Sequence, residues 1–403
     1  MTTSAVGSDQ NNYKDDAMTP GARVSAAIEI LDAMSEGLAA EQALTRWARQ
    51  SRFAGSKDRA AVRDHVFDVL RRRCTAAYYG QGESGRALMA GLLYEQDADL
   101  DSLFNGQGHA PQPLTDQERV FPSAPADRAT RLNLPDWLIP LFDQALGEKA
   151  DATALALQDR APICLRVNLA RTDVAKAQDL LREEGVETQL NLLAEAALTV
   201  MEGARRIRNS HAFSEGFVEL QDAASQAVVA ALPGGGRVLD YCAGGGGKAL
   251  ALAMDGTRKI TAHDIDPRRM GDLPARAARA GVQIDTAATA EVKAGGPYDL
   301  VLCDAPCSGS GAWRRAAEGK WTLTAERLTE LTGIQDSILE EAAALVAPKG
   351  TLAYATCSLL REENEDRVAA FLARHDGWKI SQTQRFGVTP DGDGFFSTQL
   401  TRE

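Results

Sequence analysis

The segment VLDYCAGGGGKAL, residues 238–250, predicts the fold of the larger part of this 403-residue chain. An apolar run ends near Asp240, four consecutive glycines follow, and Lys248 opens a run of helix-forming residues. Glycine lets a turn pass close to a ligand, and the first amides of the next helix attract an anionic group. The pattern predicts a strand, a nucleotide-binding turn and a helix. A dinucleotide fingerprint would read G-x-G-x-x-G, so the turn alone leaves the ligand class open.

Strand and helix patterns alternate from this segment to the C-terminus. The strand patterns lie at 259–265, 298–305 and 351–358, and the helix patterns at 267–281, 324–347 and 361–375. Such alternation is typical of a Rossmann-like α/β domain, in which ligands bind at the carboxyl ends of parallel strands. We assign residues 219–403 to this domain. Asp264, which ends the second strand pattern, is placed to accept hydrogen bonds from a ribose, and both NAD and S-adenosylmethionine carry one.

The chain before residue 219 divides into three parts. Residues 1–20 are polar without an apolar period and are predicted to be a disordered tail. Residues 21–150 carry apolar side chains at spacings of three and four, which predicts an all-α domain. Residues 155–218 read as strand, helix and strand, and are predicted to be a small α/β linking subdomain.

Composition narrows the classes of protein that the chain can belong to. It has no apolar run long enough for a membrane span and no secretory signal pattern, so we expect a cytoplasmic protein without membrane contact. Its six scattered cysteines form no paired motif, so we expect reduced thiols and no metal site. The net charge of −12 opposes indiscriminate binding to phosphates, but local basic clusters such as 205–208 and 314–315 keep an RNA partner possible. We expect a monomer.

Two cysteines follow two of the predicted strands, in LVLCDAPCSGSG (300–311) and LAYATCS (352–358). Amino-group methyltransferases of this architecture have Asn/Asp-Pro-Pro-aromatic where this chain has Asp304-Ala-Pro-Cys307. A nucleophile replaces the aromatic ring, so the methyl acceptor is predicted not to be an amine. A single cysteine is often only a small buried hydrophobic residue, but two at equivalent strand ends favour chemistry.

Carbon 5 of cytosine is an acceptor that would need such thiols. It becomes nucleophilic only after a thiolate adds to carbon 6, and a carboxylate near nitrogen 3, here Asp304, helps that addition. Cys357 is predicted to attack, because a helix expected to begin near Leu359 would lower the pKa of its thiol. Cys307 lies in a Gly/Ser loop.

Taken together, these motifs resemble the Sun/Fmu family of RNA 5-methylcytosine methyltransferases. The words GFVELQDAASQAVVAAL, VLDYCAGGGGK, DAPCSGSGAWRR, ATCS and DGFF occur in the family's order over about residues 160–403. The helical N-terminal region, especially SRFAGSKDRAAVRDHVFDVLRRR, is similar to the NusB-like RNA-binding domain of bacterial 16S ribosomal RNA members. The resemblance implies an S-adenosylmethionine-dependent enzyme acting on RNA, with 16S rRNA as the expected substrate.

The resemblance also implies roles for individual residues. Cys357 is the nucleophile, Cys307 assists release of the methylated base, and Asp304 contacts cytosine and borders the cofactor. Asp264 holds the ribose of S-adenosylmethionine. The methionine end is held by Cys242, Ala243, Gly244, Gly245, Gly246, Gly247 and Lys248. Trp313, Arg314 and Arg315 are candidate RNA contacts, and Arg166 and Asn168 are candidates for the same groove.

Departures from the family pattern and rival functions remain. The usual turn reads C-A-A-P-G-G-K, whereas Gly245 stands at the proline position here, which predicts a more flexible loop. No acidic residue after the third strand is clear, so we assign no contact there. The rivals are the same chemistry on tRNA, a non-catalytic RNA-binding assembly factor, and a small-molecule or protein methyltransferase.

Overall fold

The computed structural model describes residues 18–402, which form two compact units, Met1–Asn133 and Leu134–Glu403. The predicted tail at 1–20 lies mostly outside the described residues, and its last residue, Pro20, already belongs to a helix. No helix in residues 18–402 is both long enough and apolar enough to span a bilayer.

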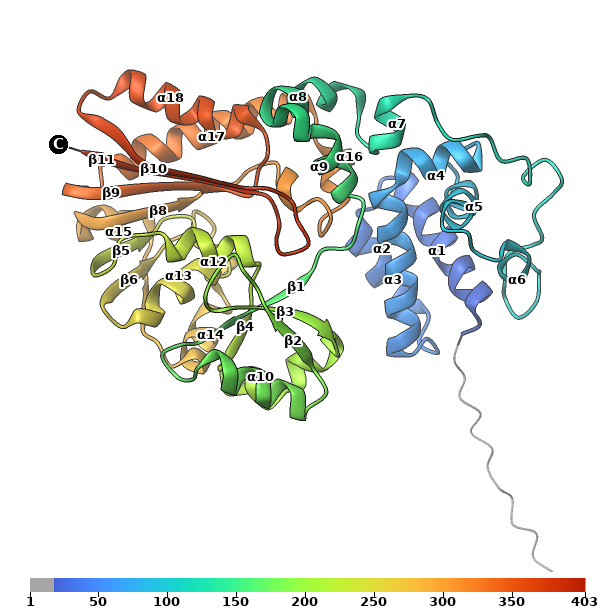
Figure 1. Cartoon of the computed structure of the whole chain (residues 1–403), viewed down its shortest axis with the longest axis horizontal. Helices are drawn as coiled ribbons and strands as arrows, with labels where there is room; N and C mark the ends of the chain where they lie inside the picture. Colours follow the sequence, from blue (N-terminus) through green and yellow to red (C-terminus); the bar gives the residue numbers. More distant parts are fainter. Residues whose placement is uncertain (1–17, 403) are drawn as a thin grey trace, which may run out of the picture. The chain divides into compact units, whose positions relative to one another are not determined.

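The N-terminal unit is helical throughout its described part (Figure 1). Its helices are α1 (Pro20–Ser35), α2 (Ala40–Gln50), α3 (Ser56–Arg71), α4 (Arg73–Gly80), α5 (Gly85–Glu95), α6 (Leu100–Leu103) and α7 (Arg128–Leu132). Helix α1 starts where the Thr19 side chain accepts a hydrogen bond from the amide of Ala22, with Pro20 in the first turn. Helices α4 and α5 pack closely because residue 91 is glycine: a Cβ there would lie 2.0 Å from the carbonyl oxygen of Ala76.

The division between the units falls at Asn133 and Leu134 rather than near the expected residue 150. Helices α8 (Ile139–Leu146) and α9 (Ala150–Ala156) therefore belong to the second unit. The physical reason is packing: Phe142 of α8 is 1% exposed, and its ring stacks on Trp313 with the centroids 6.1 Å apart. Burying an aromatic side chain contributes about 1.5–3 kcal/mol, which ties α8 to the second unit.

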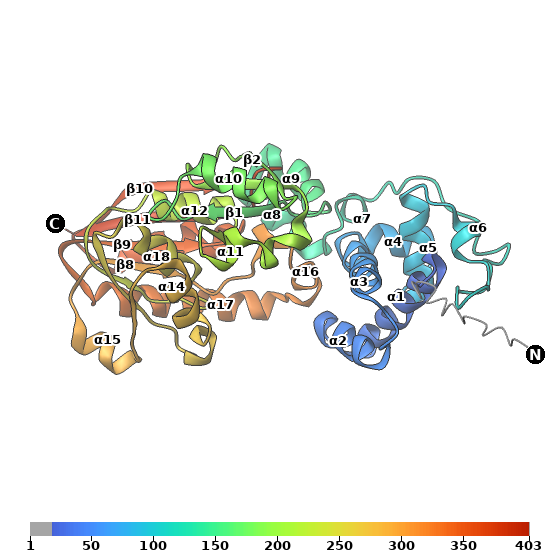
Figure 2. The same ribbon diagram turned by 90° about the horizontal axis from the view of Figure 1, so that it is seen from below.

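A four-stranded antiparallel sheet follows, in the order β2-β3-β1-β4. Its elements are β1 (Ile163–Val167), α10 (Val174–Glu183), β2 (Glu187–Leu190), β3 (Ala197–Glu202), the 3-10 helix η3 (Ala204–Asn209), α11 (His211–Ser214) and β4 (Val218–Leu220). Helix α10 lies beside β2 (Figure 2). Its Ala177 and Leu181 share a buried cluster with Leu165 and Leu198 of the sheet. The predicted small α/β unit is present, and its sheet extends to Leu220.

The C-terminal half is built on a seven-stranded sheet in the order β10-β11-β9-β8-β5-β6-β7. The strands are β5 (Gly236–Asp240), β6 (Arg258–Ala262), β7 (Ile284–Thr286), β8 (Tyr298–Asp304), β9 (Val346–Thr356), β10 (Trp378–Phe386) and β11 (Phe395–Arg402). Strands β5 to β9 pair in parallel, whereas β11 is antiparallel to both β9 and β10. The expected Rossmann-like α/β fold is confirmed, with an antiparallel C-terminal hairpin as its addition.

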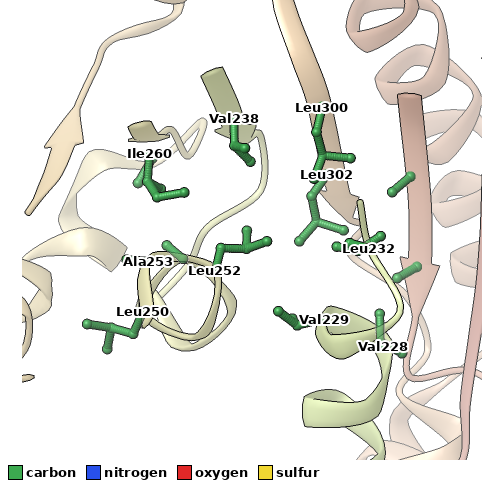
Figure 3. Close-up of a cluster of buried hydrophobic side chains, with 14 of the residues drawn as sticks. Val228, Val229, Leu232, Val238, Leu250, Leu252, Ala253, Ile260, Leu300 and Leu302 are labelled. Carbon is green, nitrogen blue, oxygen red and sulfur yellow. The ribbon is translucent and has the colours of Figure 1, made fainter. Parts of the chain in front are cut away.

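Helices cover both faces of this sheet (Figure 1). They are α12 (Ala223–Ala230), α13 (Gly247–Leu252) and α14 (Leu273–Ala280) on one face, and α15 (Thr289–Gly295), α17 (Ala325–Ala343) and α18 (Glu365–Arg374) on the other; the short α16 (Gly319–Thr322) lies in a connection. Figure 3 shows the first face, where Leu300 and Leu302 of β8 meet Leu252 of α13 and Val228 of α12. Leu302 is fully buried, so Leu302→Ala would cost about 2–5 kcal/mol.

Candidate active site

The candidate site lies where β8 and β9 end. These strands are parallel neighbours, with Asp304 in register with Ala355, so the loops that follow them leave the same edge of the sheet. Cys307 and Cys357 are carried on those two loops, and their Sγ atoms are 3.5 Å apart. The structure therefore brings the two predicted cysteines into contact, and their chemical roles stay a prediction.

One buried carboxylate fastens the two cysteine loops together. Glu363 is fully buried, and its Oε1 accepts hydrogen bonds from the amide of Ser308 at 2.7 Å and from Nε2 of Gln335 at 3.1 Å. Its Oε2 accepts one from Oγ of Ser308 at 2.5 Å and another from Oγ of Ser358. Because Ser308 follows Cys307 and Ser358 follows Cys357, Glu363 fixes the separation of the two thiols.

Further contacts hold the same two loops. Gln335 of α17 is fully buried and donates from Nε2 to the carbonyl of Pro306 at 2.9 Å. Ser310 Oγ lies 3.1 Å from Ser358 Oγ and accepts from the amide of Leu359 at 2.8 Å. Sequence reasoning missed Glu363 and Gln335, because a glutamate in a polar run and a glutamine in a helix give no signal until the chain folds.

The helix expected to begin near Leu359 begins later. Residues Arg361–Glu363 form a 3-10 turn, and α18 starts at Glu365. The buried Asn364 delays it: its Nδ2 donates to the carbonyl of Ser358 at 2.9 Å, while its Oδ1 accepts from Oγ1 of Thr356 at 2.5 Å. The prediction that a helix N-terminus acts directly on the Cys357 thiol is therefore wrong.

A lysine ammonium supplies positive charge at this site instead. Lys248, at the start of α13, donates from Nζ to Oδ2 of Asp304 at 2.7 Å, and its side chain is 8% exposed. Burial acts to lower the pKa of Lys248, but Asp304, followed by Cys357 and Asp240, raises it above its ordinary value. The lysine is therefore a cation that neutralises Asp304 at the edge of the sheet where the two cysteine loops begin.

The Cys307 thiol favours its protonated form. The hydrogen bond with Cys357 raises the pKa of the Cys307 thiol, and burial and the charges of Cys357 and Glu363 raise it further. Either sulfur can be the donor in the hydrogen bond between the two cysteines. The contact therefore places a thiol that can exchange a proton next to the Cys357 sulfur.

Internal hydrogen bonds, including one from Arg276, hold the glycine turn. The Gly246 amide donates to the carbonyl of Ala243 at 2.8 Å, and φ is +78° at Gly246, where a Cβ would lie 2.3 Å from Cδ1 of Leu273. The Gly245 carbonyl accepts a hydrogen bond from Nη1 of Arg276, which also forms an ion pair with Glu219. The expectation of a more flexible loop is therefore not met at Gly245, because Arg276 restrains its carbonyl.

Acidic groups border this turn. Burial, with a contribution from the Asp304 charge, raises the pKa of Asp240 to about 7, and neither carboxylate oxygen of Asp240 has a hydrogen-bond partner among residues 18–402. Asp264 accepts from the Gly244 amide at 2.9 Å, and Nη1 of Arg269 lies 3.0 Å from it. These carboxylates fit a cationic ligand such as S-adenosylmethionine, since the orphaned oxygens of Asp240 can each accept a hydrogen bond.

Two of the three predicted RNA contacts, Trp313 and Arg314, are buried, whereas Arg315 is exposed. Trp313 is 1% exposed, and its indole donates to the carbonyl of Ser308 at 3.1 Å. Nε of Arg314 lies 2.6 Å from Oδ1 of Asp393, with the side chains 3% and 2% exposed. Arg315 forms ion pairs with Asp393 and, at 3.0 Å, with Asp222. The burial of Trp313 and Arg314 does not support their assignment to RNA, whereas the assignment of Arg315 stays a prediction.

Arg166 and Asn168 also have internal partners. Arg166 is 5% exposed and donates to the carbonyl of Gly247 at 3.0 Å. Asn168 donates to the carbonyls of Gly216 at 3.1 Å and Ala280 at 2.8 Å. Both residues fasten the four-stranded sheet to the catalytic domain, and their expected place in an RNA groove is not supported.

A cavity of about 610 Å³ opens beside the thiols. Its lining includes Cys357, Phe395 and Leu220, together with Arg205 and Arg208 of η3. Cavities of this size accommodate ligands of a few hundred daltons. The described residues contain no group of three or more His, Cys, Asp or Glu side chains placed to hold a metal ion.

The sequence of this chain matches two protein families and several known proteins. Residues 227–399 match the family described as 16S rRNA methyltransferase RsmB/F, and residues 134–205 match the ferredoxin-like domain of RsmF/B-like methyltransferases. The ribosomal RNA small subunit methyltransferase B of Xylella fastidiosa is 33% identical over 393 residues, which cover 86% of this chain and 90% of that protein.

The chain belongs to the RsmB/F family. A probable ribosomal RNA small subunit methyltransferase B of Bacillus subtilis is 34% identical over 258 residues, covering 61% of this chain and 57% of that protein. The crystal structure of PH0851 is similar in fold, with a TM-score of 0.76, 24% identity, and coverage of 95% of this chain and 99% of that one. RsmB/F membership confirms the resemblance predicted from the motifs and S-adenosylmethionine as cofactor.

Proposed function

We propose that this member of the RsmB/F family transfers a methyl group from S-adenosylmethionine to carbon 5 of a cytosine in 16S rRNA, with Cys357 as a covalent nucleophile. The observation that carries the proposal is the pair of thiols, 3.5 Å apart beside the Asp304–Lys248 ion pair. A binding protein has no need of two adjacent thiols at one strand edge. The rRNA small subunit methyltransferases among its relatives support the choice of 16S rRNA over tRNA.

The first chemical step uses the sulfur of Cys357. As it bonds to carbon 6 of cytosine, the electron pair of the carbon 5–carbon 6 double bond becomes available at carbon 5. Asp304 faces the ring, where a hydrogen-bonding group offsets charge at nitrogen 3 and the exocyclic amine. S-adenosylmethionine, when bound, supplies an electrophilic methyl group.

The last step frees the enzyme from the base. The methylated carbon 5 loses its hydrogen as a proton, and the electrons of that bond re-form the double bond to carbon 6. The electrons of the carbon 6–sulfur bond leave with the Cys357 sulfur. We assign Cys307 to this release: its thiol gives a proton to the departing Cys357 sulfur, 3.5 Å away, and the Cys307 sulfur takes the proton that leaves carbon 5.

Other roles complete the proposal. Residues 242–248 hold the methionine end of S-adenosylmethionine, and Asp264 holds its ribose after Arg269, whose side chain is 57% exposed, moves away from the carboxylate. The helical N-terminal unit acts as a NusB-like RNA-binding domain. A cytoplasmic location and a monomeric state remain predictions from the sequence.

The nucleophile is tested with Cys357→Ala. We expect no transfer of tritiated methyl groups to 16S rRNA, with S-adenosylmethionine binding retained by calorimetry. Cys74→Ala, which removes a thiol from the N-terminal unit, is the matched control and should retain activity. Turnover by the Cys357→Ala enzyme would reject the covalent mechanism.

The release role is tested with Cys307→Ser. The variant should form the carbon 6 adduct and fail to resolve it, so a protein–RNA band should survive a denaturing gel. The band should disappear in the Cys307→Ser/Cys357→Ala double variant. A Cys307→Ser enzyme that turns over normally without such a band would refute the assignment.

The substrate is identified by bisulfite sequencing of total RNA from a deletion strain and its parent. The proposal predicts that one 5-methylcytosine disappears from 16S rRNA and returns when the wild-type chain is expressed. Loss of a methylcytosine from tRNA alone would instead support the rival substrate.

A further inference from the structure

The 3-10 helix η3 presents two arginines on one side. A 3-10 helix has three residues per turn, so Arg205 and Arg208, three positions apart, point in the same direction, whereas Arg206 does not. Arg205 and Arg208 line the cavity that contains Cys357, and Arg206 does not. Ile207, 1% exposed, anchors the helix between them in the core of the four-stranded sheet.

These two arginines differ from the other arginines nearby in having no internal partner. Within residues 18–402, Arg205 and Arg208 are exposed and form no hydrogen bond or ion pair. Arg206 instead donates from Nη1 to the carbonyl of Glu184 at 3.3 Å. Exposed cations fixed on a short rigid helix are available for an anion from outside the chain.

The other charged residues that line the cavity form ion pairs with one another. Asp222 and Asp393 line it, but both carboxylates form ion pairs with Arg315. The uncompensated positive charge of the lining therefore comes from Arg205 and Arg208. This charge is local, because the chain as a whole carries −12. A phosphate would therefore be attracted to η3, although the negative net charge of the chain repels it elsewhere.

Other residues of the lining offer apolar surface that a nucleobase can contact. Phe395 and Leu220 contribute apolar surface, and Ile163 is 38% exposed. A base turned out of its stack needs apolar surface for the ring and cations for the phosphates on either side of it. The cavity offers both, with the Cys357 thiol in the same lining.

We propose that Arg205 and Arg208 bind the RNA phosphates that flank the target nucleotide, and that this cavity receives the nucleotide for attack by Cys357. The inference rests on the proposed function for the identity of the acceptor. The phosphate contact itself is a property of η3 that can be measured by binding alone. Single-stranded RNA is the ligand class, since base-specific readout of RNA requires unstacked bases.

The test compares Arg205→Ala/Arg208→Ala with Arg206→Ala/Arg182→Ala, which removes the same charge. Arg182 lies on α10 and forms an ion pair with Asp179. Binding of in vitro transcribed 16S rRNA is measured by filter retention over a range of salt concentrations. We expect the first variant to bind about tenfold to a hundredfold more weakly, and its slope of log K against log salt to fall by about 1.4. The control should retain the wild-type slope.

Two further variants separate phosphate binding from folding. Arg205→Lys/Arg208→Lys keeps both charges and should recover most of the slope. All variants should bind S-adenosylmethionine as the wild type does. The inference is overturned if Arg205→Ala/Arg208→Ala matches its control in affinity and slope, even where the wild type methylates RNA. If instead the wild type methylates no RNA but the slope still depends on these arginines, the proposed function fails and the binding site stands.

Discussion

Removing the Glu363 carboxylate should loosen the loops that carry both thiols. Glu363→Ala leaves the amide of Ser308 without its acceptor, and Nε2 of Gln335 loses one of its two hydrogen bonds but keeps the one to the Pro306 carbonyl. The hydroxyls of Ser308 and Ser358 can rotate to other acceptors. A buried unsatisfied donor costs about 1–3 kcal/mol and the loss of a further hydrogen bond about 1 kcal/mol, so the free energy of unfolding should fall by about 3 kcal/mol.

Glu363→Gln should be much milder. The amide oxygen can still accept from Ser308 and Gln335, and its NH₂ group can donate to the two serine hydroxyls after they rotate. We expect a loss of about 1 kcal/mol. For methyl transfer, we expect kcat to fall more than about 100-fold for Glu363→Ala and less than about tenfold for Glu363→Gln, because displacement of the reacting groups by about 1 Å has effects of that order.

Urea unfolding followed by tryptophan fluorescence suits this measurement, since four of the five tryptophans lie after Asn133. Glu362→Ala is the matched control: it removes the neighbouring carboxylate, whose Oε2 has no hydrogen-bond partner among residues 18–402, and should change stability by less than about 0.5 kcal/mol. Equal effects at 362 and 363 would refute the reasoning. So would a Glu363→Gln variant as impaired as Glu363→Ala, because charge rather than loop anchoring would then be responsible.

Two more predictions concern buried charges. Because burial raises the pKa of Asp240 to about 7, the folded protein binds this proton more tightly than the unfolded chain, and the free energy of unfolding should fall as pH rises from about 4 to 7. Asp240→Asn should flatten that dependence and be more stable than the wild type at pH 8 by up to about 4 kcal/mol. Urea unfolding of the cofactor-free protein measures both effects. A variant that keeps the wild-type pH dependence would contradict the prediction. Asp393→Asn removes the buried carboxylate charge that pairs with both Arg314 and Arg315 and should cost about 3–5 kcal/mol in the same assay. Asp391→Asn is its control, because the hydrogen bonds at Asp391 use backbone atoms, and equal stability of the two variants would argue against a buried ion pair.

Sequence order predicted those parts of the site that depend on strand ends. Asp304, Cys307 and Cys357 follow apolar runs, and parallel pairing of adjacent strands brings such ends together whatever the intervening chain does. The glycine turn was also recognisable, because its four glycines follow the apolar run that ends near Asp240. The Rossmann-like domain was therefore predictable from alternation alone.

Residues that act through distant partners were not predictable in this way. Glu363 reads as one acid in the run REENED, and only folding brings Ser308 to it from 55 positions away. Arg314 and Arg315 read as surface cations, because their partner Asp393 lies 79 and 78 positions later. Asn364 delays a helix that periodicity alone would start earlier.

The order in which the strands are synthesised bears on when activity first becomes possible. Strand β9, which leads to Cys357, has β11 as its neighbour on the side away from β8, although β11 is made later than β10. The turn just before β11 carries Asp393, which holds the Cys307 loop through Arg314. A nascent chain still lacking residues 393–402 therefore has both thiols but neither the strand nor the counter-charge that orders them. We therefore expect ribosome-bound or prematurely terminated chains not to methylate RNA. The Cys307 and Cys357 thiols should be able to react only when translation of this region finishes.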